Sequence, residues 1–230
     1  MTPLVLLPGM MCDARLWAPQ MAALGRRAVL HAPLTEHDTV GALAASVLAA
    51  APPRFALAGL SMGGIVAMEI LRQAPERVER LALLDTNPRA KLPQTRAARE
   101  PQIAAARAGR LRAVMRDELK PNYLVDSPGK PAILDLCMDM ALTLGPDVFV
   151  RQSRALAARP DQTATLAAWR GPALILMGAE DRLCPRDRHD QMHALLAGST
   201  LTIVDAAGHL PTLEQPQRTT AALVRWLEDP

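Results

Sequence analysis

Short runs of consecutive apolar residues recur along this chain, each bounded by turn-forming residues. Hydrophobicity that is nearly continuous, rather than alternating, is typical of strands in a parallel sheet that is covered on both faces. We therefore predict strands at Leu4–Leu7, Ala28–His31, Phe55–Leu60, Val78–Asp85, Ala173–Met177 and Thr200–Asp205.

Segments with apolar residues at helical spacing lie between these runs. One begins at an N-capping residue, Asp38, and two begin near a proline, where the missing N–H is harmless. The predicted helices are Asp38–Ala50, Ile65–Arg72, Pro185–Ala197 and Pro216–Leu227. Because strand and helix alternate, we predict an α/β fold with a mostly parallel sheet and helices on both faces.

The alternation stops between residues 89 and 164, where the pattern predicts helices but no strand. The predicted helices there are Thr95–Ala108, Leu111–Leu119, Ile133–Leu142 and Asp147–Ala158. We predict that 89–164 is a helical cap inserted into a core formed by 1–88 and 165–230. The alternative is a second helical domain that folds on its own.

Composition adds limits on the class of protein. Half of the 230 residues are apolar, which supplies a sizeable core, and the net charge of +3 is too weak to indicate nucleic-acid binding. The N-terminal residues lack a basic stretch, and no apolar segment is long enough for a membrane span. The three cysteines, Cys12, Cys137 and Cys184, suggest no disulfide framework, so we expect a cytoplasmic protein.

The strongest local motif is Gly59-Leu60-Ser61-Met62-Gly63, between a predicted strand and a predicted helix. This G-x-S-x-G pattern places a nucleophilic serine on a tight strand-to-helix turn where only small neighbours fit. The helix N-terminus adds amide donors and a positive dipole end beside the serine. The alternative is a glycine-rich turn without chemistry.

A serine needs a base, and His209 is the best candidate. It lies in a loop after the last predicted strand, from which an imidazole can reach the serine. His189 and His193 are four residues apart on a predicted helix, but the metal-binding pattern H-E-x-x-H is absent. We interpret them as two exposed polar residues and expect no metal site.

The base in turn needs a carboxylate to orient its ring. Asp181 follows the strand Ala173–Met177, and Asp85 closes the strand before it. Both lie at the same edge of the predicted sheet, so the residues alone leave the two open.

Together these motifs resemble the α/β-hydrolase superfamily over nearly the whole chain. The resemblance rests on Leu6–Met11, Gly59–Gly64, Gly178–Asp181 with Pro185, and Gly208-His209 leading into Leu213–Pro216. It implies a catalytic triad of Ser61, Asp181 and His209, an oxyanion hole formed by the backbone N–H groups of Met10 and Met62, and no cofactor. The sequence departs from many relatives in having Pro8 where they carry histidine. It also starts at what resembles the third strand, so we expect the family's N-terminal hairpin to be missing.

The resemblance implies hydrolysis of a carboxylic ester or thioester of a small molecule through an acyl-enzyme. Small carboxylesterases, methyl ester esterases acting on carrier-protein-bound pimelate, and enol-lactonases are similar. The alternatives are an enol-lactonase, a carbon–carbon bond hydrolase on the same triad, and a non-catalytic ligand-binding protein. The segment from Arg89 to Lys120 contains nine positive residues and three negative ones, which suggests an anionic or carrier-protein-bound substrate. The alternative is a soluble helical face that is rich in arginine. The sequence carries no signal for oligomeric state.

Overall fold

The computed structural model describes residues 1–90 and 99–228. Six strands form one sheet in the order β2-β1-β3-β4-β5-β6, and every neighbouring pair is parallel. The strands are β1 (Leu4–Leu7), β2 (Val29–His31), β3 (Phe55–Leu60), β4 (Val78–Leu84), β5 (Ala173–Gly178) and β6 (Thr200–Val204). Each lies within one residue of its predicted bounds. The predicted fold class, a parallel sheet with helices on both faces, is confirmed.

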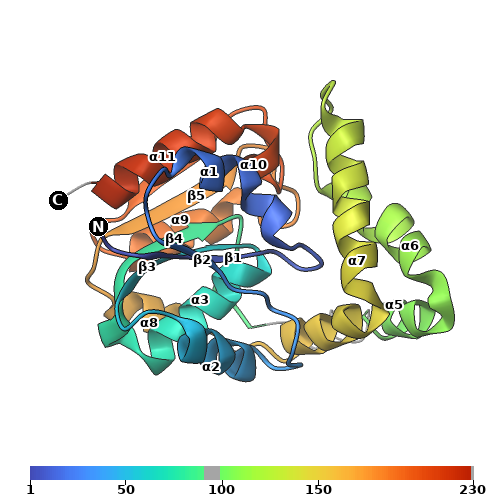
Figure 1. Cartoon of the computed structure of the whole chain (residues 1–230), viewed down its shortest axis with the longest axis horizontal. Coiled ribbons are helices and arrows are strands. Elements are labelled where there is room, and N and C mark those ends of the chain that lie inside the picture. The colour runs from blue at the N-terminus through green and yellow to red at the C-terminus, as the bar shows by residue number, and fades with distance from the viewer. Residues whose placement is uncertain (91–98, 229–230) are drawn as a thin grey trace.

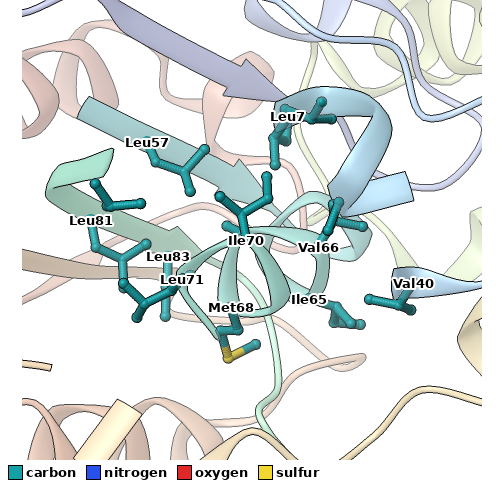
Figure 2. Close-up of a cluster of buried hydrophobic side chains, with 14 of the residues drawn as sticks. Leu7, Val40, Leu57, Ile65, Val66, Met68, Ile70, Leu71, Leu81 and Leu83 are labelled. Atoms are coloured by element: carbon teal, nitrogen blue, oxygen red, sulfur yellow. The ribbon is translucent and has the colours of Figure 1, made fainter. Parts of the chain in front are cut away.

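Helices cover both faces of the sheet (Figure 1). On one face lie α2 (Val40–Ala50), α3 (Met62–Gln73), α8 (Thr163–Ala168) and α9 (Arg186–Leu195). On the other lie α1 (Ala18–Ala23), α10 (Pro211–Glu214) and α11 (Pro216–Glu228). Successive residues of a strand point to opposite faces, so the strands contribute side chains to two separate apolar cores. The first core lies on the face covered by α2, α3, α8 and α9, and the second core lies on the face covered by α1, α10 and α11. Figure 2 shows part of the first core, where Val66 and Ile70 of α3 lie beside Leu7 and Leu57 of the sheet.

Between β4 and β5, the described residues form helices and turns but no strand. Besides α8, these elements are α5 (Glu100–Ala105), η3 (Ala106–Arg110), α6 (Leu111–Ala113), η4 (Val114–Leu119), η5 (Lys120–Asn122) and α7 (Lys130–Ala157). The two helices predicted at Ile133–Leu142 and Asp147–Ala158 are joined in α7, with a break at Gly145, whose φ is +80°, next to Pro146. The start of the predicted helix Thr95–Ala108 lies outside the described residues.

These helices stand at one end of the sheet (Figure 1) and have a core of their own, which includes Ile103, Val114 and Phe149. Met11 belongs to the loop of residues 8–13 that follows β1 (the β1 loop), and it packs into that core. Tyr123 packs into the second core of the sheet. We propose on this ground that the described residues within 89–164 form a cap on the sheet domain; residues 91–98 of the predicted cap lie outside the described part of the chain. Within the described residues, no helix has both the length and the apolar character that crossing a membrane requires.

Candidate active site

Ser61 occupies a strained turn between β3 and α3. Its backbone has φ 54° and ψ −113°, a positive φ that side chains other than glycine rarely adopt. The turn is held on both sides, because the Ser61 N–H donates to Leu84 O (2.9 Å) and Thr86 Oγ1 donates to Ser61 O (2.7 Å). The serine therefore projects from the carboxyl end of the sheet at the start of a helix, where backbone amides are free to donate.

Glycine is required at positions 59, 63 and 64 because neighbouring atoms leave no room for a Cβ. A Cβ placed on Gly59 would lie 2.3 Å from Gly63 O, and one on Gly63 would lie 2.3 Å from Leu7 O. A Cβ on Gly64 would meet the Thr86 side chain at 2.6 Å. The helix α3 can thus press against β1 and β4 only because these positions lack side chains.

We expect Gly63→Ala to lower the free energy of unfolding by about 3 kcal/mol, because the obstructing atom is backbone and cannot swing aside. Gly129→Ala is the matched control: its φ is −81° and no heavy atom lies within 4 Å of its added Cβ, so a change within about 0.5 kcal/mol is expected. Urea denaturation of both variants measures the difference. Equal stability of the two would contradict the packing argument.

A line of hydrogen bonds joins Ser61, His209 and Asp181. The Oγ of Ser61 lies 2.9 Å from His209 Nε2, and His209 Nδ1 lies 2.9 Å from Asp181 Oδ2. Asp181 and His209 are buried, at 5% and 4% exposure, while Ser61 is half-buried. The structure thus brings together three residues that the sequence separates by up to 148 positions.

Asp181 is held as an anion. Its Oδ1 accepts the N–H groups of Leu183 (2.8 Å) and Cys184 (3.1 Å). Burial by itself raises the pKa of Asp181, but His209 and these two amides outweigh it, so the pKa lies below its ordinary value. The carboxylate is therefore ready to orient the imidazole.

Asp85, the other candidate acid, is placed differently. It is fully buried at the end of β4, with φ 45°, and its Oδ1 accepts the Gly178 N–H (2.9 Å). Burial, and then the negative charge of Asp181, hold the pKa of Asp85 well above its usual range. The His209 ring bonds to Asp181, so the geometry favours Asp181 as the orienting carboxylate.

The loop that carries His209 is fixed by contacts that the sequence did not reveal. The His209 N–H donates to Tyr123 O (2.6 Å) in the cap segment. Glu214 Oε2 accepts the N–H groups of Gly208 (2.9 Å) and Leu210 (3.1 Å), and its Oε1 accepts that of Val125 (2.9 Å). The only sequence signal for Glu214 was its place in the Gly-His…Glu-x-Pro pattern of the resemblance.

The β1 loop supplies the first candidate oxyanion donor. Within the described part of the chain, the N–H of Met10 donates to no acceptor, whereas the N–H of the next residue, Met11, donates to Gln152 Oε1 (2.8 Å). Met11 has φ 57°, so the loop turns sharply after Met10. Met62, the second candidate, is the first residue of α3, where helix geometry leaves the N–H without a partner in the helix. Gln152 of α7 was missed by sequence reasoning, because nothing local marks it.

A cavity of about 120 Å³ opens beside Ser61 and His209. Its lining includes Gly9 and Met10 of the β1 loop, together with Arg99 and Tyr123 of the cap segment. The cavity is small, and most of its lining is apolar. A small acyl group next to the serine fits this space.

The nine positive residues from Arg89 to Lys120 differ in their exposure. Among those that the structure describes, four are exposed: Arg107, Arg110, Arg112 and Arg116. Lys120 is buried instead, its Nζ donating to Leu134 O, and burial lowers its pKa. Lys91 and Arg96 lie outside the described residues.

The two histidines of α9 also differ. His193 is exposed, but His189 is fully buried, so the prediction that both are exposed is wrong for His189. Helix α9 packs on β5 and β6, and His189 lies on the same helix face as the buried Met192, three residues on. The sequence pattern predicts that the polar His189 is exposed, whereas the packing of α9 on the sheet buries it.

Asp181, Cys184 and His209 bring three possible metal-ligand atoms within 4.8 Å of one another. The two Asp181 oxygens already accept hydrogen bonds from His209 and from backbone amides. This engagement favours a hydrogen-bond relay at these residues over a metal centre.

Comparison with known proteins groups this chain with hydrolases. The model of the alpha/beta hydrolase family matches residues 4–223. The pimeloyl-acyl-carrier protein methyl ester esterase of Pectobacterium carotovorum subsp. carotovorum is 26% identical, with 99% of this chain and 94% of the relative covered. A solved esterase of Thermogutta terrifontis, with malate bound, superposes with a TM-score of 0.90 at 27% identity, covering 99% of this chain and 89% of its own. The enol-lactonase of Burkholderia xenovorans gives 0.87 at 22% identity, covering 100% and 92%, a likeness of fold.

Proposed function

Because the chain belongs to the alpha/beta hydrolase family, we propose that it is a serine hydrolase that cleaves a carboxylic ester or thioester of a small molecule through an acyl-enzyme. One observation carries the proposal: Ser61 Oγ, the His209 ring and the Asp181 carboxylate are joined by two 2.9 Å hydrogen bonds beside a cavity. A nucleophile, a base and an orienting acid in that order are what acyl transfer needs. The esterases among its relatives support the same bond type.

In the first half-reaction, Ser61 Oγ bonds to the carbonyl carbon while His209 Nε2 takes the hydroxyl proton. The carbonyl π electrons move onto its oxygen. As the tetrahedral intermediate collapses, His209 returns the proton to the leaving alcohol or thiol, and the acyl group stays on Ser61. Asp181 keeps the Nδ1–H tautomer in place and stabilises the imidazolium that forms between these steps.

In the second half-reaction, water takes the place of the leaving group. His209 removes a proton from the water as its oxygen bonds to the acyl carbon, and then gives that proton to Ser61 Oγ. The products are the carboxylic acid and the regenerated serine. In both halves, we propose that the N–H groups of Met10 and Met62 hold the oxyanion. Loss of one such donor typically costs about 3 kcal/mol of transition-state stabilisation.

The proposed mechanism is checked by a fluorophosphonate probe, which phosphonylates an activated serine. We expect one adduct per chain, on the peptide that contains Ser61, and none on heat-denatured protein, because activation depends on His209 being held at hydrogen-bond distance. Mass spectrometry of the digested protein locates the adduct. An unlabelled native protein, or a label on another serine, would contradict the assignment.

A panel of substrates at equal concentration shows which type of bond is cleaved and whether the acyl group is a small molecule or is bound to a carrier protein. We propose small acyl esters as the substrates, since the cavity beside Ser61 is small. The names of the esterase relatives, and the exposed arginines of the cap, support testing a methyl ester carried on an acyl carrier protein as a second class. Enol-lactones and thioesters complete the panel, because the same triad opens each of these carbonyl compounds.

A further inference from the structure

The cavity beside Ser61 contains a guanidinium group that has no carboxylate partner among the described residues. Arg99, just before α5, lines this cavity and is partly buried. Among the described residues, no carboxylate oxygen comes within 4.0 Å of it, and its side-chain partners are Gln102 Oε1 (3.4 Å) and Met10 Sδ (3.7 Å). The sequence from residue 91 to 98 contains no Asp or Glu. Neither contact compensates a buried positive charge.

A second guanidinium group, that of Arg159, lies near Arg99 and adds positive charge. Burial lowers the pKa of Arg99, and it also lowers that of Arg159, with mutual repulsion between the two guanidinium groups as a further cause for Arg159. Tyr123 is close by, but burial raises the pKa of its phenol, so it stays neutral. Glu118 also lines the cavity, yet it is exposed and its Oε2 accepts the Gln102 amide (2.9 Å).

We propose that Arg99 binds a carboxylate on the acyl part of the substrate, so that this chain prefers monoesters of short dicarboxylic acids. The inference rests on the proposed function, in which Ser61 holds the acyl group. The acyl group remains in the cavity through both half-reactions, while the leaving group must depart. Because Arg99 touches the side chain of Met10, the candidate oxyanion donor, the guanidinium lies close to the carbonyl end of that acyl group.

The chemistry of the pair favours a carboxylate. A guanidinium presents a planar fork of donors that matches the two oxygens of a carboxylate, and the pair forms better in a site partly removed from water. A monoester of a short diacid supplies a carboxylate partner for Arg99, and the acyl chain separates that charge from the scissile carbonyl. The exposed arginines of the cap differ from Arg99 because salt screens them.

The test compares two phenyl esters of equal acyl length, the monophenyl ester of glutaric acid and phenyl pentanoate. We expect wild-type kcat/KM to be at least tenfold higher for the glutarate ester at both 0.05 and 0.5 M NaCl, values that span about 14 to 4 Å of screening length. Arg99→Gln should lower kcat/KM at least tenfold more for the glutarate ester than for phenyl pentanoate. Arg107→Gln, an exposed cap arginine, is the matched control and should leave both substrates unchanged.

Binding of free glutarate, measured by calorimetry, separates this inference from the proposed function. We expect glutarate to bind the wild type and to bind Arg99→Gln at least tenfold more weakly. If neither ester is hydrolysed while glutarate binding depends on Arg99, the proposed function is wrong and the Arg99 site stands. Equal kcat/KM for the two esters, a preference that 0.5 M NaCl abolishes, or equal losses for both esters in Arg99→Gln would overturn the inference.

Discussion

Replacing Ser61 by alanine is expected to lower kcat/KM for ester hydrolysis by about 10⁴-fold or more while leaving the fold intact. In the proposed mechanism, the Oγ that lies 2.9 Å from His209 Nε2 forms the acyl bond, and alanine retains everything except that atom. The residual rate is expected to come from the candidate oxyanion donors and from binding alone, which in triad enzymes still exceeds the uncatalysed rate. Steady-state kinetics on a small phenyl ester measures the loss.

Ser153→Ala is the matched control for this variant. Ser153 is a fully buried serine of α7, and its Oγ has no hydrogen-bond partner among the described residues. Its removal should change kcat/KM by less than threefold, and circular dichroism should show both variants folded. A Ser61→Ala protein that keeps a tenth of the wild-type activity would exclude Ser61 as the nucleophile.

The strands were predictable from the sequence because a strand that is buried on both faces consists of consecutive apolar residues. A strand such as Phe55–Leu60 has no solvent face, so its hydrophobicity is continuous and its ends coincide with the ends of the run. The start of α3 was predicted at Ile65, but the helix begins at Met62. Gly63 and Gly64 have low helix propensity, and their presence in the first turn follows from close approach to β1 and β4 rather than from any helical pattern.

The residues of the candidate triad were also visible, because each lies in a short motif next to a strand end. No comparable sequence motif marks the residues whose contacts support the site. Gln152 fixes the β1 loop from 141 positions away, and neither its type nor its neighbours mark that contact. Arg99 was counted as one of nine positive residues in a segment, since charge along a chain does not distinguish an exposed guanidinium from one inside a cavity. Tertiary packing decides both cases.

Asp181→Asn should lower kcat/KM by about 10⁴-fold, the loss that the same change produces in a serine protease. Asparagine keeps the size of the side chain. Its amide, however, can turn an N–H toward His209 Nδ1, which favours the wrong tautomer and removes the charge that stabilises the imidazolium. The two amides of Leu183 and Cys184 that now stabilise the anion would then face a neutral group.

Asp85→Asn is the matched control, and we expect it to lower kcat/KM by less than about tenfold. Burial and the charge of Asp181 hold the pKa of Asp85 well above its usual range, which favours the uncharged form of this carboxyl. An asparagine is uncharged as well, and its Oδ1 can accept the Gly178 N–H as the carboxyl does. Kinetics of both variants on the same ester, with melting curves to confirm folding, separate the two aspartates. A large loss of kcat/KM in Asp85→Asn together with a small loss in Asp181→Asn would identify Asp85, at the end of β4, as the acid that orients His209 and stabilises its imidazolium.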